Sequence, residues 1–278
     1  MRYLLLACML LASLSAAVAS DQKAEQLVAQ HLDSIGTAEA RAAVKSRALK
    51  GTLHFKVLTG GTGDTPGKWA LVSEQGKSNF VMRFGDSHWS GERFVLDGDK
   101  TSFAAFTGSH QPTEVAVFVK SHDVVIKQGL LGGALSTGWA LLNLDHSRVK
   151  LDYIGRKNID GRELEGLEYL SKSNGEMTIK LYFDPETHRH LMTVYSVSRA
   201  ATIAHNDIAN ARQQSIRYTI EERFSDFQTE NGITLPHHYD LQYGRQLQNG
   251  SVLQYDWDMT AEKVLNNPDI DPENFQIK

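Results

Sequence analysis

The 278-residue sequence has few of the residues that cross-link or stiffen small secreted proteins. It contains one cysteine, Cys8, and six prolines. Cys8 lies in a segment that we expect to be removed, so the mature chain has no cysteine. That absence excludes both a disulfide framework and a cysteine nucleophile. The fold must therefore depend on an apolar core, and the remaining 259 residues are enough to form one.

Local concentrations of one charge are also missing. Charged residues make up 22% of the chain and give a formal net charge of −4, yet no run reaches five charges of one sign. Nucleic-acid binding requires a basic face, and recruitment to anionic membranes requires a polybasic cluster. The sequence predicts neither class of partner.

An apolar run near the N-terminus has the features of a secretory signal. Arg2 precedes the almost unbroken apolar residues 4–14, and Ala17-Val18-Ala19 supplies the small residues that signal peptidase recognises. The run is too short to cross a bilayer, which needs about 20 residues. We therefore predict a signal peptide over residues 1–19 and one mature domain over residues 20–278 without a transmembrane segment.

Lipidation of Cys8 is the alternative interpretation of this segment. Leu5-Leu6-Ala7-Cys8 is similar to a lipobox, but cleavage there leaves only about four apolar residues before the cysteine. Signal cores normally contain about 7–15 apolar residues. The length favours an ordinary cysteine within the signal core.

No catalytic or cofactor-binding motif is present. The serine within Gly133-Ala134-Leu135-Ser136-Thr137-Gly138 does not match the G-x-S-x-G pattern of a serine hydrolase. The glycine-rich stretch before Lys68 lacks the Ser or Thr and the following helix that a phosphate-binding loop requires. We predict no enzymatic activity, no catalytic residue and no cofactor.

Pairs of polar residues do not indicate a site either. Close pairs of histidines or aspartates are His188 and His190, His237 and His238, and Asp256 and Asp258. None has a third ligand at a diagnostic spacing, so we interpret the histidines as surface residues and predict no metal site. Glu221 and Glu222 are adjacent within a predicted strand and point to opposite faces, so we interpret both as solvated.

Most of the mature chain shows the period-two alternation of half-buried β-strands. Leu49, Leu53 and Phe55 alternate with polar residues, and similar patterns recur as far as Met259. Turns such as Asp97-Gly98-Asp99 link consecutive strands, which predicts an antiparallel sheet. About ten such strands are expected to curl into a barrel or an incomplete barrel. The glycine-rich residues 60–67 are expected to form a turn, and no linker divides the chain.

Two regions are predicted to be helical. Residues 27–35 have helical apolar spacing and end at Gly36, and a short helix follows over residues 38–44. Residues 114–144 are mostly apolar and rich in glycine, which predicts one or two helices that cover the sheet. Three glycines interrupt that region, and we predict that they form the hinge of a lid, with a fixed turn as the alternative. They are Gly129, Gly132 and Gly133.

Several segments taken together resemble the LolA-like superfamily of bacterial envelope proteins. They are residues 27–36 followed by residues 38–40 and a strand at residues 49–51, then residues 182–187, Phe227 with residues 231–236, and the C-terminal residues 267–275. The resemblance spans nearly the whole mature chain. It implies an α+β, β-rich fold, in which a half-open antiparallel β-barrel is covered by N-terminal and central helices around an apolar cavity.

The resemblance also implies a function. Family members carry lipoprotein acyl chains across the periplasm or sense them, which implies a periplasmic, non-enzymatic carrier or sensor of lipid or lipoprotein acyl chains. The acting residues are then apolar side chains that line the cavity. The inward-facing candidates are Leu53, Phe55, Phe80, Met82, Phe84, Phe94, Leu181 and Tyr195.

A second hypothesis is an envelope protein-interaction module with a filled barrel core and no lipid ligand. Alternating strands occur in both cases, so the pattern does not separate them. The polar residues 199–215 are the predicted contact with a protein partner, because such a segment is able to become ordered on binding.

Overall fold

The computed structural model describes residues 21–74, 76–85, 90–106, 112–199 and 215–277. The predicted signal peptide, Cys8 and all but the two ends of the polar segment 199–215 lie outside these residues. Within the described part of the chain, no helix is long and apolar enough to cross a membrane.

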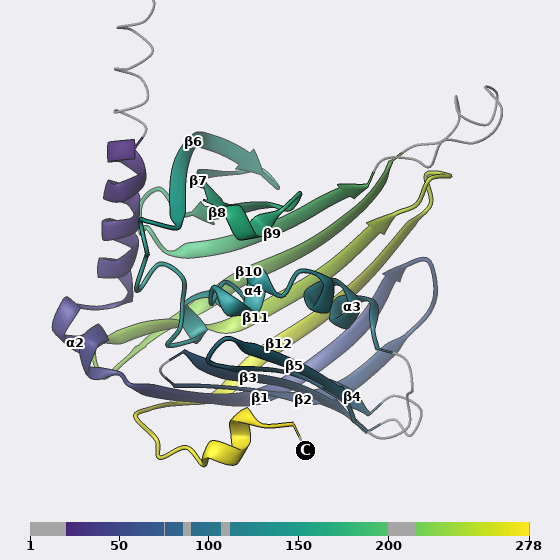
Figure 1. Cartoon of the computed structure of the whole chain (residues 1–278), viewed down its shortest axis with the longest axis horizontal. Coiled ribbons are helices and arrows are strands. Elements are labelled where there is room, and N and C mark those ends of the chain that lie inside the picture. The colour runs from purple at the N-terminus through teal and green to yellow at the C-terminus, as the bar shows by residue number, and fades with distance from the viewer. Residues whose placement is uncertain (1–20, 75, 86–89, 107–111, 200–214, 278) are drawn as a thin grey trace, which may run out of the picture.

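The described residues form a twelve-stranded antiparallel sheet that curls around a concave face (Figure 1). The strands are β1 (Ser46–Thr59), β2 (Asp64–Glu74), β3 (Lys77–Phe84), β4 (Gly91–Asp97), β5 (Lys100–Ala105), β6 (Val149–Ile159), β7 (Arg162–Ser171), β8 (Thr178–Phe183), β9 (His190–Arg199), β10 (Ile216–Glu230), β11 (Ile233–Gln246) and β12 (Val252–Asn266). Their order across the sheet is β5-β4-β3-β2-β1-β12-β11-β10-β9-β8-β7-β6. The edge strands β5 and β6 do not pair with each other, so the barrel is half open.

The alternation within β1 shows how the sequence builds this sheet. Leu49 and Leu53 are buried, whereas Lys50 and Thr52 are exposed. Burial of one leucine side chain contributes about 1.5–3 kcal/mol. A shift of register by one residue would expose every inward side chain of the strand, so the hydrophobic pattern fixes the pairing.

Helices occupy the concave face and one end of the sheet (Figure 1). The first helix is described over residues 21–35 and lies beside β6, where Asp21 is within 3.7 Å of Lys150. The other helical elements are α2 (Ala38–Ala43), α3 (Glu114–Ser121), α4 (Val124–Lys127) and the 3-10 helices η1 (Gly133–Leu135), η2 (Lys172–Asn174) and η3 (Pro272–Phe275). α3 and α4 lie inside the curl of the sheet.

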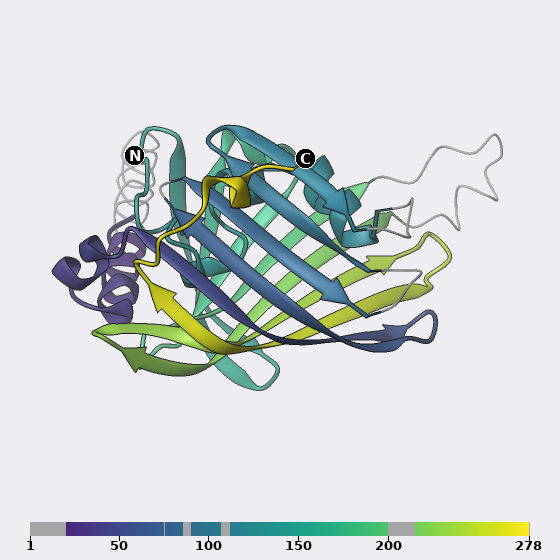
Figure 2. The same ribbon diagram turned by 90° about the horizontal axis from the view of Figure 1, so that it is seen from below.

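The C-terminal segment packs on the convex face, where Figure 2 shows it crossing the strands. The Asn274 carbonyl accepts hydrogen bonds from Asn79 Nδ2 on β3 at 2.8 Å and from Arg93 Nη2 on β4 at 3.0 Å. Phe275 is buried beside them. The segment therefore covers β3 and β4 on the side away from the concave core.

The predicted architecture of an open antiparallel barrel with covering helices is confirmed. One local prediction was wrong, because residues 64–67 belong to β2 instead of a turn. Pro66 pairs with His54 and Gly67 pairs with Leu53 on β1. Composition favoured a turn there, but the long neighbouring strand supplies a partner for the backbone, and a turn propensity does not prevent that pairing.

Candidate ligand-binding cavity

The predicted cavity residues lie in the apolar core on the concave side of the sheet. Seven of the eight side chains are buried, namely Leu53, Phe80, Met82, Phe84, Phe94, Leu181 and Tyr195. Phe55 is half-buried and packs against the same core. Burial alone does not distinguish a cavity wall from a filled core, so their role in binding stays a prediction.

A cavity of about 310 Å³ lies between β2–β4 and residues 126–138. Of the predicted residues, Phe80, Phe94, Gly129 and Gly132 line it, and the other six inward candidates do not. The remaining apolar side chains of its wall are Leu71, Leu96, Ile126, Leu131 and Tyr239. The half-exposed Lys127 marks its solvent side.

Residues 113–142 pack over the concave face of the sheet, and we refer to them as the cover. Within the cover, residues 126–138 contribute to the wall of this cavity. Thr113 begins α3 by accepting the Ala116 N–H at 3.1 Å. The cover then buries most of its apolar side chains against the sheet, among them Val115, Phe118, Val119, Val125, Leu130, Leu135, Trp139 and Leu141. The prediction that residues 114–144 cover the sheet is confirmed, although the helices are short.

Glu222 on β10 fastens the middle of the cover to the sheet. Its Oε1 accepts the Gly132 N–H at 2.6 Å and the Tyr239 hydroxyl at 2.7 Å, and its Oε2 accepts the Tyr195 hydroxyl at 2.6 Å. The side chain is completely buried, and burial raises the pKa of Glu222 to about 7. The interpretation of Glu222 as a solvated residue was therefore wrong.

A sequence signal for Glu222 exists, because strand alternation places it on the inward face. Ile220 and Phe224 lie two residues to either side and are buried. A carboxylate between two inward apolar positions is a candidate for a buried, hydrogen-bonded group. Composition and motif scans do not detect it, since its hydrogen-bond partners come from distant parts of the chain.

Two further polar side chains hold the cover next to Glu222. Arg47 Nη1 on β1 donates to the Ala134 carbonyl at 2.6 Å, and Ser73 Oγ on β2 accepts the Thr137 N–H at 2.9 Å. Burial lowers the pKa of Arg47 to about 10, which leaves the guanidinium charged at neutral pH. The cover is thus tied to β1, β2 and β10 within six residues of its own sequence.

α3 is held on both sides of the concave face. The Thr113 hydroxyl donates to the buried carboxylate of Glu92 on β4 at 2.7 Å. Glu114 accepts from the Tyr243 hydroxyl at 3.1 Å and from Arg245 at 3.2 Å, both on β11. β3, β2, β1 and β12 separate β4 from β11 in the sheet, so the first turn of α3 spans the concavity. Burial raises the pKa of Glu92 to about 7.

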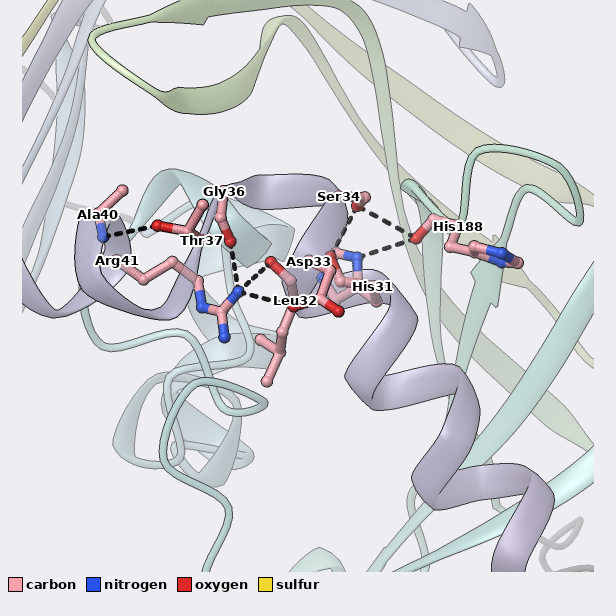
Figure 3. A network of polar contacts seen from close by, with 9 residues as sticks. All are labelled: His31, Leu32, Asp33, Ser34, Gly36, Thr37, Ala40, Arg41 and His188. Atoms are coloured by element: carbon pink, nitrogen blue, oxygen red, sulfur yellow. Dashed lines mark hydrogen bonds and ion pairs between the residues drawn. The ribbon is translucent and has the colours of Figure 1, made fainter.

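The N-terminal helix holds the end of the cover through a buried histidine, whose surroundings are shown in Figure 3. His31 Nε2 accepts from Trp139 Nε1 at 3.2 Å, so its Nδ1 carries the proton and donates to the His188 carbonyl at 3.1 Å. Burial lowers the pKa of His31 to about 4, which keeps the ring neutral at neutral pH. Arg41 fixes the end of this helix by donating to the carbonyl of Leu32 in its last turn and to that of Gly36 just beyond it.

The three predicted hinge glycines all have left-handed backbone conformations. The φ angles are 66° at Gly129, 80° at Gly132 and 51° at Gly133. A side chain at Gly129 would overlap the Gly138 carbonyl, and one at Gly133 would press on the His190 ring. These positions require glycine in the observed turns. That the turns also act as a hinge stays a prediction.

The interpretation of the histidine pairs as surface residues was wrong for two of them. His190 and His237 are buried, and His190 stacks on Trp139 with ring centroids 5.0 Å apart. His188 lies in the turn before β9, so it does not share a strand face with His190. In the described ranges, no group of three or more His, Cys, Asp or Glu side chains is arranged to hold a metal ion.

No protein-family model matches the sequence, and no match was found among curated proteins. Among solved structures, the chain is similar to a LolA superfamily protein from Nitrosomonas europaea, with 12% identity, a TM-score of 0.45, and coverage of 91% of this chain and 97% of that one. A domain provisionally described as an outer-membrane lipoprotein-sorting protein, from Vibrio parahaemolyticus, gives 9% identity, a TM-score of 0.42, and coverage of 89% and 97%.

A DUF1329 family protein from Desulfovibrio piger gives 11% identity, a TM-score of 0.40, and coverage of 91% and 97%. These similarities extend along nearly the whole chain and concern the fold alone. The fold itself is an open antiparallel barrel with helices in its concavity, which is the architecture that the sequence resemblance implied. The similarities to solved structures say nothing about a ligand or a partner of this chain.

Proposed function

We propose that the protein is a non-enzymatic carrier or sensor that binds an acyl chain of a lipid or lipoprotein in the cavity under the cover, outside the cytoplasm. The observation that supports this proposal is an apolar cavity between the sheet and a separate covering segment. Its volume of about 310 Å³ is near the lower end of the range of about 300–1,000 Å³ that is typical of ligand sites. Such a space suits a single chain.

Hydrophobic transfer is sufficient to hold such a ligand. Each methylene that moves from water into an apolar cavity contributes about 0.8 kcal/mol. The side chains of Phe80, Phe94 and Ile126 form an apolar wall, and the half-exposed Lys127 lies where a polar group of the ligand would remain in water. Binding therefore needs no covalent chemistry and no catalytic residue.

Two measurements test the proposal. Native mass spectrometry of protein purified from a bacterial envelope is expected to show a bound lipid mass. A dansyl-labelled fatty acid is expected to gain fluorescence on binding the delipidated protein and to be displaced by an unlabelled fatty acid. Protein without lipid that also fails to bind the probe would contradict the proposal.

A pair of cover variants locates the site. Leu131→Arg places a charge in the wall of the cavity and is expected to weaken probe binding at least tenfold, because a buried unpaired charge is costly. Leu142→Arg is the matched control, since Leu142 is also a half-buried leucine of the cover but does not line this cavity. Equal losses in the two variants would place the probe elsewhere.

The second candidate is a protein-interaction module without a lipid ligand. The observation that favours it is the packing of six of the eight inward candidates in the core, away from the cavity. The predicted contact over residues 199–215 lies outside the described residues except at its ends. This candidate predicts normal folding, no lipid mass and no probe binding in the tests above.

A further inference from the structure

We propose that Glu222 is a positioning residue that joins the inner wall of the cavity to its cover and thereby sets how fast a bound chain is released. The effect on release rests on the proposed function, whereas the link between Glu222 and the cover concerns the ligand-free protein. No motif points to this residue, and it touches no part of the cavity surface itself.

The geometry joins two cavity-lining groups through one oxygen atom. Glu222 Oε1 accepts from the Gly132 N–H at 2.6 Å and from the Tyr239 hydroxyl at 2.7 Å, and both Gly132 and Tyr239 line the cavity. Gly132 belongs to the cover and Tyr239 to β11 of the sheet. Motion of the cover away from the wall must break the bond to Gly132.

The second carboxylate oxygen fixes the direction of the first. Oε2 accepts the Tyr195 hydroxyl at 2.6 Å from β9, while Tyr239 approaches from β11. β9 and β11 flank β10 on its two sides, so the carboxyl group is held between its neighbouring strands. The group is therefore oriented before the cover docks, which reduces the entropy lost when the Gly132 bond forms.

Removal of the carboxyl group has a predictable local effect. Without it, one backbone N–H and two hydroxyl groups remain buried without this acceptor, and an unpaired buried donor is strongly disfavoured. The cover is not part of the hydrogen-bonded sheet, so its backbone moves toward water more readily than β10 or β11 and is able to satisfy the Gly132 N–H there. The loss of stability is therefore expected to be larger at Gly132 than in the β-sheet.

Amide hydrogen exchange of ligand-free protein tests this step without any ligand. In Glu222→Leu, the Gly132 amide is expected to exchange at least tenfold faster than in the wild type, while amides of β10 and β11 change by less than threefold. Glu222→Gln retains an acceptor oxygen and is expected to stay within threefold at Gly132. Release of a dansyl-labelled fatty acid is expected to accelerate at least fivefold in Glu222→Leu alone.

A tyrosine pair provides a milder test if Glu222→Leu does not fold. Tyr239→Phe removes one hydrogen bond to Oε1 and is expected to accelerate Gly132 exchange two- to fivefold. Tyr169→Phe is the matched control, because Tyr169 is a buried tyrosine on β7 that is not bonded to Glu222. Gly132 exchange in the control is expected to match the wild type.

Three results overturn the proposal. They are unchanged Gly132 exchange in a folded Glu222→Leu variant, equal exchange in the two tyrosine variants, and faster exchange without faster probe release. If the wild type binds no probe at all, the proposed function fails instead. The exchange rates of the variants then decide by themselves whether Glu222 joins the cover to the wall.

Discussion

Glu92 and Glu222 are glutamates on the concave face, where a charged carboxylate is disfavoured by the loss of water. Burial raises the pKa of each to about 7 in the folded protein, from the ordinary value of 4.5. Between these two values the folded state binds more protons than the unfolded state. Their contribution to stability is therefore complete below about pH 4.5 and is lost as the pH rises through about 7.

A prediction for Glu222 follows from this direction. The free energy of unfolding of the wild type, minus that of Glu222→Gln, is expected to fall by about 2–3 kcal/mol between pH 5 and pH 8.5. Tyr195 and Tyr239, which face Glu222 from the neighbouring strands, stay protonated because burial raises their pKa well above 10.

The comparison with Glu222→Gln also removes other titrations from the measurement. Two titratable groups lie next to the cover near Gly132. Arg47 donates to the Ala134 carbonyl and the His190 ring lies beside Gly133, and both are unchanged in the wild type and in Glu222→Gln. His31, whose ring contacts that of His190, is also unchanged in both proteins. Urea denaturation at several pH values measures the difference. A difference that does not vary with pH would contradict the prediction.

At the scale of an element, the start of α3 combines a helix cap with a sheet contact. The Thr113 hydroxyl accepts the Ala116 N–H and donates to the buried Glu92, whereas Thr37 at the start of α2 accepts the Ala40 N–H and contacts only the exposed carboxylate of Glu39. Both caps have an alanine at the third helical position. The two threonines therefore differ mainly in the buried carboxylate that only α3 contacts.

We expect this difference to appear in matched valine variants. Thr37→Val is expected to cost about 1 kcal/mol, which is typical for loss of a cap. Thr113→Val is expected to cost about 1–3 kcal/mol more, because Glu92 loses its buried hydrogen-bond donor. Chemical denaturation measures both values, and equal costs would show that the Glu92 contact contributes little.

At the scale of the whole molecule, the sheet separates two packed faces. The cavity and the cover lie on the concave face, and the C-terminal segment with Phe275 packs on the convex face of β3 and β4 (Figure 2). Side chains on opposite faces of a strand do not touch each other. Stability and ligand binding are therefore expected to respond separately to changes on the two faces.

Phe275→Ala tests this separation. Phe275 is only 3% exposed, so its truncation is expected to cost about 3–5 kcal/mol of stability. Affinity for the dansyl-labelled fatty acid is expected to change by less than twofold in the folded fraction. Leu265→Ala is the control, because Leu265 is 42% exposed and its loss is expected to cost about 0.5 kcal/mol or less. A large loss of affinity in Phe275→Ala would show that the faces are coupled.

Strand patterns and turn residues were enough to predict most of the strands, their antiparallel arrangement and many of the apolar side chains that face inward. Period-two alternation and turn residues are local properties, and they indicate which face a side chain occupies without knowledge of distant contacts. Leu53, Phe80 and Phe94 were found in this way. The N-terminal helix and the apolar cover were also evident, since their spacing differs from that of the strands.

Whether an inward side chain borders open space or fills the core depends on contacts that exist only in the folded chain. Phe80 and Phe94 line the cavity, whereas Leu181 and Tyr195 do not, although all four have the same strand pattern. The same is true of Glu222, whose bond to Gly132 joins residues 90 positions apart. A local pattern reports the face of a side chain, but its neighbours on that face come from distant segments that only the folded chain brings together.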